Sequence, residues 1–286
     1  MTPQEVNEML SAIKEDQESK QFKRKTWSPP SDKEGDFKIR ILPPLKRKAE
    51  KLFYAFYKVH WIGKAPYLCL GQRLQDKSGE WHEPENCPAC EFVRKQYKLA
   101  GSDKECDEYK LASSLSARDR YLYRIIVRGS EDETTPVLWE SSKTMQSAIV
   151  AFMTSDNPDK NYGIIVDPLQ GRDFILTKVG KGQRSNYDQS VPSKNESPIF
   201  PEKEKIQKVL LAAEKLDYNS IFEFSSADTI SGALRDYISG DSEEAVSIAK
   251  DRKVESKHSE IRIEEKSDDG KADSEDAIDD ILKDLF

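Results

Sequence analysis

The sequence predicts an α+β protein that is mainly β: a small antiparallel barrel, interrupted by helices and followed by a disordered acidic C-terminal tail. Short segments between Phe37 and Val179 alternate apolar and polar residues and are separated by turn residues, which is typical of antiparallel strands. Residues 241–286 hold 16 acidic and 8 basic residues and few aromatic ones. A stretch of this composition is too polar to form a core, so we expect it to be flexible.

The charge of the chain is distributed unevenly. Its 286 residues include 45 Lys and Arg and 52 Asp and Glu, which makes a formal net charge of −7. The tail alone carries −8, so residues 1–240 together carry +1. The acidic pI of 5.3 therefore does not exclude a nucleic-acid partner. We expect one core, residues 28–240, between an N-terminal segment, residues 1–27, and the tail, residues 241–286.

The N-terminal segment is expected to begin with a helix. Thr2-Pro3-Gln4-Glu5 has the pattern of a capping box with proline at the first helical position, and apolar residues follow at helical spacing. The basic cluster Lys23-Arg24-Lys25 comes next, before Ser28-Pro29-Pro30 interrupts regular structure.

Within the core the period of the pattern distinguishes strands from helices. Alternation of period two predicts strands over residues 37–41, 54–62, 121–127, 137–139, 163–166 and 174–179. Apolar residues at helical spacing predict helices over residues 91–99, 142–152, 206–213 and 227–237.

The cysteines predict a metal site. Cys87-Pro88-Ala89-Cys90 brings two thiolates to one side of a tight turn, and His60 and Cys69 lie upstream. A Cys3His set closes a tetrahedron with no open position, so we expect one structural Zn2+ that orders the loop over residues 71–86. A redox pair, which requires a βαβ unit, and inert buried thiols are the alternatives. Cys106 and His82 are possible substitutes among the ligands.

Basic and aromatic residues are interleaved as in proteins that bind single strands, where cations neutralise phosphates and rings stack on unpaired bases. Tyr121 and Tyr123 share one face of a predicted strand, with Arg118 and Arg120 at its entrance beside them. Any single ring is as well explained by packing in the barrel. The remaining candidates are Lys181, Arg184, Tyr187, Tyr67, Phe92, Tyr97 and Trp139.

These residues resemble the family of single-stranded DNA-binding proteins of T-even bacteriophages. The similarity covers roughly residues 22–240 and the tail, and it is most specific at Cys87-Pro88-Ala89-Cys90 and Ser185-Asn186-Tyr187-Asp188. It implies an OB-fold barrel with a zinc subdomain at about residues 58–110, Zn2+ on the one His and three Cys, and a DNA cleft lined by Tyr121, Trp139 and Tyr187. It also implies a role in viral DNA replication, recombination and repair, with Lys23-Arg24-Lys25 used for self-association along DNA.

The end of the tail is expected to dock partner proteins. Ile278, Ile281, Leu282 and Leu285 fall on one helical face, next to the terminal Phe286, with carboxylates on the other face. We expect polymerase, helicase loader and recombinase as partners, and we expect the tail to compete with DNA for the basic cleft. A tail that only confers solubility is the alternative.

Several classes of protein are disfavoured. A zinc deaminase needs a His-x-Glu motif, and His82-Glu83 lacks the spacer; no P-loop motif occurs either, so we expect no enzyme. No apolar run has the length of a membrane span and no export signal begins the chain, so a cytoplasmic, non-secreted protein is expected. The resemblance implies that the cell is a bacterial host. A zinc-stabilised protein-interaction adaptor and an RNA-binding module stay open as alternatives.

Overall fold

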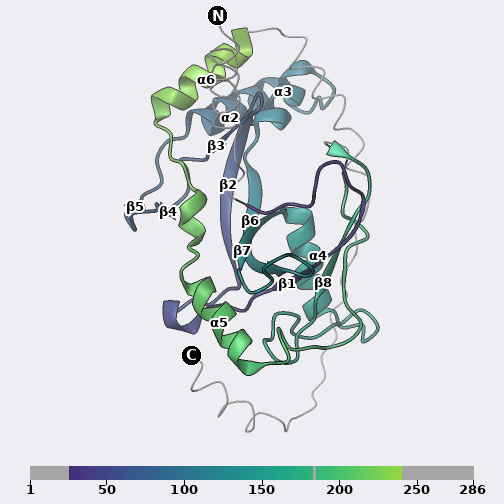
Figure 1. Ribbon diagram of the computed structural model, residues 1–286. Helices are drawn as coiled ribbons and strands as arrows, with labels where there is room; N and C mark the ends of the chain where they lie inside the picture. The colour runs from purple at the N-terminus through teal and green to yellow at the C-terminus, as the bar shows by residue number, and fades with distance from the viewer. Residues whose placement is uncertain (1–25, 183–184, 240–286) are drawn as a thin grey trace, which may run out of the picture.

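A computed structural model describes residues 26–182 and 185–239, and their arrangement is shown in Figure 1. The elements in chain order are β1 (Gly35–Ile41), η1 (Lys46–Lys48), β2 (Tyr54–Ile62), β3 (Ala65–Leu68), β4 (Leu74–Gln75), β5 (Trp81–His82), α2 (Pro88–Ala100), α3 (Asp107–Leu115), β6 (Arg118–Val127), β7 (Val137–Ser142), α4 (Lys143–Thr154), β8 (Phe174–Lys178), β9 (Val191–Pro192), α5 (Lys203–Glu214), η3 (Tyr218–Ile221) and α6 (Ala227–Ser239). The fold is therefore a mixture of α and β, as the sequence predicts. It is not mainly β, because the α-helices hold more of the described residues than the strands do.

The main sheet is antiparallel and is organised around β6. Its strand order is β3-β2-β6-β1-β8-β9, and β7 also pairs with β6. β2 pairs with the first half of β6, where Phe56 lies opposite Tyr121, and β1 pairs with its end, where Ile41 lies opposite Ile125. The pairing stops at β3 and β9, so the described sheet is open and the barrel predicted from the sequence is not found.

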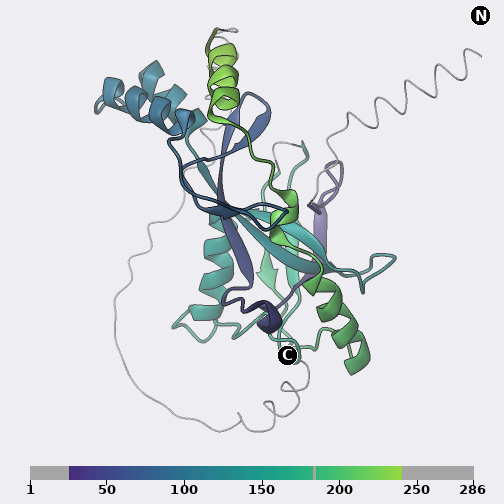
Figure 2. The same cartoon turned by 90° about the vertical axis from the view of Figure 1, so that its left-hand side faces the viewer.

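Helices cover the sheet at three places (Figures 1 and 2). α4 packs on β6 and β7, and its Ile149 lies in a core with Tyr123 and Trp139. α5 forms a second core with the chain that follows β1. α2, α3 and α6 gather at the β2–β3 end around a third core that contains Cys69 and Cys87. The cysteine-rich part of the chain thus has its own core at one end of the sheet.

Most predicted elements have the expected type because local signals agree with packing. Pro88 stands in the first turn of α2, and the Ser142 hydroxyl accepts a hydrogen bond from the Met145 N–H at the start of α4. The strand predicted over residues 163–166 is wrong. This segment is a turn that buries Ile165 and Val166 side by side, so their apolar character reflects core packing without alternation.

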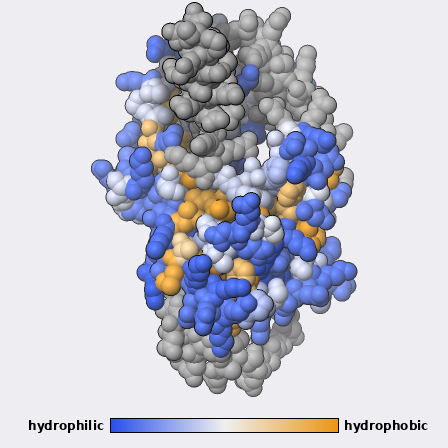
Figure 3. All heavy atoms as spheres, viewed as in Figure 1, coloured by the Kyte–Doolittle hydropathy of each residue, from blue (hydrophilic) through white to orange (hydrophobic). Residues whose placement is uncertain are grey.

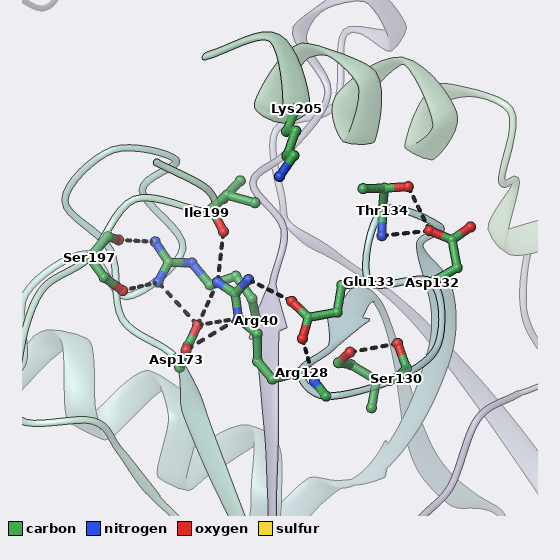
Figure 4. A network of polar contacts seen from close by, with 12 residues as sticks. Arg40, Arg128, Ser130, Asp132, Glu133, Thr134, Asp173, Ser197, Ile199 and Lys205 are labelled. Atoms are coloured by element: carbon green, nitrogen blue, oxygen red, sulfur yellow. Dashed lines mark hydrogen bonds and ion pairs between the residues drawn. The ribbon is translucent and has the colours of Figure 1, made fainter. Parts of the chain in front are cut away.

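A buried arginine network joins β1, β6 and β8 to the chain before α5 (Figure 4). The fully buried Arg40 guanidinium donates to the Asp167 and Ser197 carbonyls at 2.8 and 2.7 Å and lies 3.6 Å from Asp173. Burial lowers the pKa of Arg40 to about 10, although the Asp173 carboxylate opposes this shift. Arg128 also donates to Asp173, at 3.0 Å. These contacts hold β1, the end of β6 and the start of β8 against the chain that precedes α5.

Candidate metal centre and nucleic-acid interface

Four candidate ligands converge at the β2–β3 end of the sheet. His60 lies in β2, Cys69 follows β3, Cys87 is the N-cap of α2, and Cys90 lies in the first turn of that helix. Their donor atoms all lie within 4.8 Å of one another. His60 Nε2 is 3.5 Å from Cys87 Sγ and 3.4 Å from Cys90 Sγ, and Cys69 Sγ is 3.5 Å from Cys90 Sγ. The four donor atoms are therefore close enough together to bind one metal ion.

The ring of His60 is oriented for ligation by its other nitrogen. Its Nδ1 lies 2.8 Å from the Leu115 carbonyl, and a carbonyl only accepts, so Nδ1 carries the proton and donates. Nε2 faces the thiols. Burial lowers the pKa of His60, but hydrogen bonds with Cys69 and Cys87 outweigh this and raise it to about 10, so a metal ion would displace a proton from Nε2. Metal-binding histidines characteristically have this arrangement, because the donated hydrogen bond fixes both tautomer and orientation.

The thiols perturb one another strongly. Hydrogen bonding with Cys69 lowers the pKa of the Cys87 thiol and raises the pKa of the Cys90 thiol. The cluster therefore favours a thiolate at Cys87 beside a protonated neighbour. Because thiolates are the form that binds metal, a cation at the centre of these donors would replace the shared protons.

His82 and Cys106, the possible substitutes, lie outside this cluster. His82 Nε2 is 3.3 Å from Asp76 Oδ2, and its ring stacks on Phe224 with centroids 3.9 Å apart. Cys106 is the N-cap of α3 and accepts a hydrogen bond from the Tyr109 N–H. The redox alternative requires a βαβ unit, and all strand pairs of the described residues are antiparallel.

Three aromatic rings form a partly open surface where β2 and β6 pair, which we call the aromatic patch: Tyr54, Phe56 and Tyr121. The Tyr121 ring lies 5.6 Å from the ring of Tyr54 and 5.3 Å from that of Phe56, and Phe56 is 42% exposed. The Lys58 ammonium lies 6.0 Å from the centre of the Phe56 ring. Rings and a cation are thus exposed together along one strand.

Tyr123 and Trp139 share the face of Tyr121 but lie in the core. Tyr123 is fully buried and Trp139 is 5% exposed, with the two rings 5.1 Å apart. The Tyr123 hydroxyl donates to Gln146 of α4. A base cannot reach either ring in this arrangement, so they support the aromatic patch from within.

The arginines predicted beside Tyr121 point to the other face of the sheet. Arg118 and Arg120 pair with Val59 and Tyr57, and neighbouring positions of a strand alternate between its two faces. Arg120 forms an ion pair with Glu140 at 3.2 Å. The expected grouping of both arginines with the two tyrosines is therefore corrected.

The remaining candidates are dispersed. Three of them, Tyr67, Phe92 and Tyr97, are half-buried against the core that contains Cys69 and Cys87. Tyr187 packs against the core that contains Ile149 of α4. Lys181 is exposed. Lys23, Arg24, Lys25, Arg184, Ile278, Ile281, Leu282, Leu285 and Phe286 lie outside the described residues.

The sequence did not single out Tyr54, Phe56 or Lys58. Their signal was nevertheless present, because residues 54, 56 and 58 occupy alternate positions of a predicted strand. Two basic residues of η1 form ion pairs away from the aromatic patch: Arg47 lies 3.7 Å from Glu214, and Lys48 pairs with Asp217. Across the view in Figure 3 the described surface is mainly hydrophilic, with hydrophobic residues gathered towards its middle.

Comparisons with known proteins do not assign a family. No family model matches the sequence, and no curated protein matches it. Among the described residues, no helix has both the length and the apolar character needed to cross a bilayer. Function therefore has to be argued from the two sites.

Proposed function

We propose that the chain is a non-enzymatic protein that binds single-stranded DNA without sequence preference, through a surface centred on the aromatic patch. The observation that carries this proposal is the exposed Phe56 ring beside Tyr54 and Tyr121, with Lys58 at its edge. Unpaired bases stack on such rings whatever their sequence, and each stacked base contributes about 1–3 kcal/mol.

Charge around the aromatic patch is compatible with a phosphate backbone. Asp119 of β6 lies opposite Lys58 of β2 in the strand register. Its carboxylate lies 3.6 Å from the ammonium of Lys143, whose side chain is 73% exposed. The two lysines thus more than offset the one carboxylate. Lysines placed beside stacking rings neutralise phosphates and make binding depend on salt.

We propose Zn2+ as the metal of the cluster, with His60, Cys69, Cys87 and Cys90 as its four ligands. One nitrogen and three sulfurs suit zinc, and four protein ligands leave no position for a substrate. Bound there, the ion would supply folding free energy only. It would join the β2–β3 hairpin to the start of α2.

We also propose that the open sheet is related to the OB-fold, and that residues 241–286 compete with DNA and dock replication and recombination proteins. The continuous pairing of β1 and β2 along one edge of β6 supports the first of these proposals. The net charge of −8 in the tail supports the second, because it has the sign of a phosphate backbone. A role in coating and protecting single strands follows from the same properties.

The proposal is tested by titrating the full chain into a labelled oligo(dT) and following anisotropy across a salt series. We expect affinity to fall steeply with salt, and Phe56→Ala to weaken binding by about 1–3 kcal/mol. Trp81→Ala is the matched control, because Trp81 is 52% exposed on the separate β4–β5 sheet.

Two outcomes would contradict the proposal that the aromatic patch binds single-stranded DNA. If Phe56→Ala and Trp81→Ala weakened binding equally, the aromatic patch would not be the interface. If the chain ignored oligo(dT) at low salt, an adaptor function would be favoured, and preferential binding of oligo(U) would favour RNA, since a stacking surface is insensitive to the sugar.

A further inference from the structure

The last described helix, α6, lies against the metal cluster although more than a hundred residues separate it from the last ligand. Its buried residues Ile230 and Leu234 belong to the same core as Cys69 and Cys87. Its largest packing contact among the described elements is with α2, and it also contacts β2. Figures 1 and 2 both show α6 beside α2 at this end of the molecule.

α6 also covers the turn of the β2–β3 hairpin, which carries the candidate ligands His60 and Cys69. Gly63 joins β2 to β3 with φ +60°, and a Cβ placed there would meet the Tyr237 ring at 3.6 Å. His60 precedes this turn and Cys69 follows it. One face of α6 thus contacts both parts of the ligand set: α2 through its buried residues and the hairpin turn through Tyr237.

The segment that leads into α6 holds the chain between the ligands as well. The Phe224 ring stacks on His82 of β5, and the Asn219 amide donates to the Gln75 side chain of β4 at 3.1 Å. β4 and β5 lie between Cys69 and Cys87. Residues 219–237 therefore contact α2, the β2–β3 turn and the β4–β5 segment, which together surround the four candidate ligands.

We infer that α6 is a positioning element of the metal centre, and that its docking and metal binding are thermodynamically coupled. His60 and Cys69 on the hairpin, and Cys87 and Cys90 on α2, would hold one ion between the two segments that α6 bridges. The surface on which α6 docks exists only while these segments stay together. Loss of the ion therefore releases α6, the helix that precedes Gly240 and the acidic tail, residues 241–286, in the sequence.

Coupling of this kind is reciprocal, which makes it testable from both ends. Complete undocking of α6 must lower metal affinity by the same factor by which metal loss disfavours docking of α6, and partial undocking lowers it by less. The inference rests on the proposed metal, so the metal content of the purified full chain is measured first. A chain without stoichiometric metal overturns the metal proposal and this inference together, whereas the outcomes below concern this inference alone.

The first test follows amide hydrogen exchange of the full chain with and without a chelator. α5 is the control helix, because it packs on a different core. We expect chelation to speed exchange in α6 by about tenfold or more, within the usual range of coupling, and to leave α5 nearly unchanged. No acceleration in α6, or equal acceleration in both helices, overturns the inference.

The second test measures metal affinity, from the equilibrium distribution of Zn2+ between the full chain and a chromophoric chelator. Leu234→Ala is compared with Leu210→Ala, since the two leucines are buried alike, at 5% and 3% exposure, in α6 and α5. We expect Leu234→Ala alone to lower metal affinity about tenfold. Tyr237→Ala, a milder change at a half-buried residue, replaces Leu234→Ala if that variant fails to fold. Equal metal affinity of the α6 and α5 variants overturns the inference.

Discussion

The two halves of strand β6 present the same side-chain type to the same face, with different results. At the entrance, Tyr121 meets Tyr54 and the exposed Phe56. Two residues further on, Tyr123 is covered by α4 and hydrogen-bonds to Gln146. The difference teaches that a ring becomes a binding surface or a core residue according to where a helix lies over the sheet, and strand alternation alone does not distinguish the two.

The opposite face of β6 repeats this contrast with arginines. Arg120, near the entrance, forms an ion pair with Glu140, and the two side chains are 23% and 30% exposed. Arg124, further along, is buried, and both of its terminal nitrogens bond to Glu50, at 2.8 and 3.0 Å. Its guanidinium also lies 3.9 Å from the centre of the Tyr218 ring. On both faces the entrance of the strand is open and its second half is closed.

The strongest test of this contrast is Trp139→Ala in the closed half. Removal of a buried indole leaves a cavity, so we expect the free energy of unfolding to fall by about 3–5 kcal/mol. Urea denaturation measures the change. A loss below about 1 kcal/mol, the value typical of an exposed site, would mean that this half of the face is open after all.

Tyr121→Ala in the open half is expected to act mainly on binding. The half-buried ring packs on two neighbours, so stability should fall less than for Trp139→Ala, while affinity for oligo(dT) should weaken by about 1–3 kcal/mol. Anisotropy and urea denaturation of the same preparation separate the two effects. Unchanged affinity with a large loss of stability would make Tyr121 a core residue like Tyr123.

The smallest effect is expected for Arg120→Ala. The side chains of this ion pair are 23% and 30% exposed, so loss of Arg120 should cost about 1 kcal/mol of stability, at the upper end for exposed pairs. Because Arg120 faces away from the aromatic patch, DNA affinity should change little. The salt dependence of oligo(dT) binding should keep its slope. A slope lowered by about one would show that Arg120 contacts a phosphate and would contradict the assignment of faces.

Prediction from sequence succeeded where short-range signals suffice. The type of most elements followed from periodicity, and the four metal-site residues followed from the chemistry of thiols and imidazole, because ligand identity is visible in the chain. It failed for residues 163–166, where consecutive buried residues in a turn imitate a strand. It also missed α3, whose few buried residues, Ala112 and Leu115 among them, give a weak apolar stripe.

The sequence by itself determined the period of each segment, the His and Cys side chains of the candidate metal site and the uneven distribution of charge, since each depends on residues close together or on composition. The tertiary structure alone decided that the main sheet stays open, that Tyr123 and Trp139 are buried while Phe56 is exposed, and that α6 lies across the metal cluster. These features depend on contacts between segments far apart in the chain. Whether a side chain is buried depends on which helix or strand packs against it, and a local sequence pattern does not specify that contact.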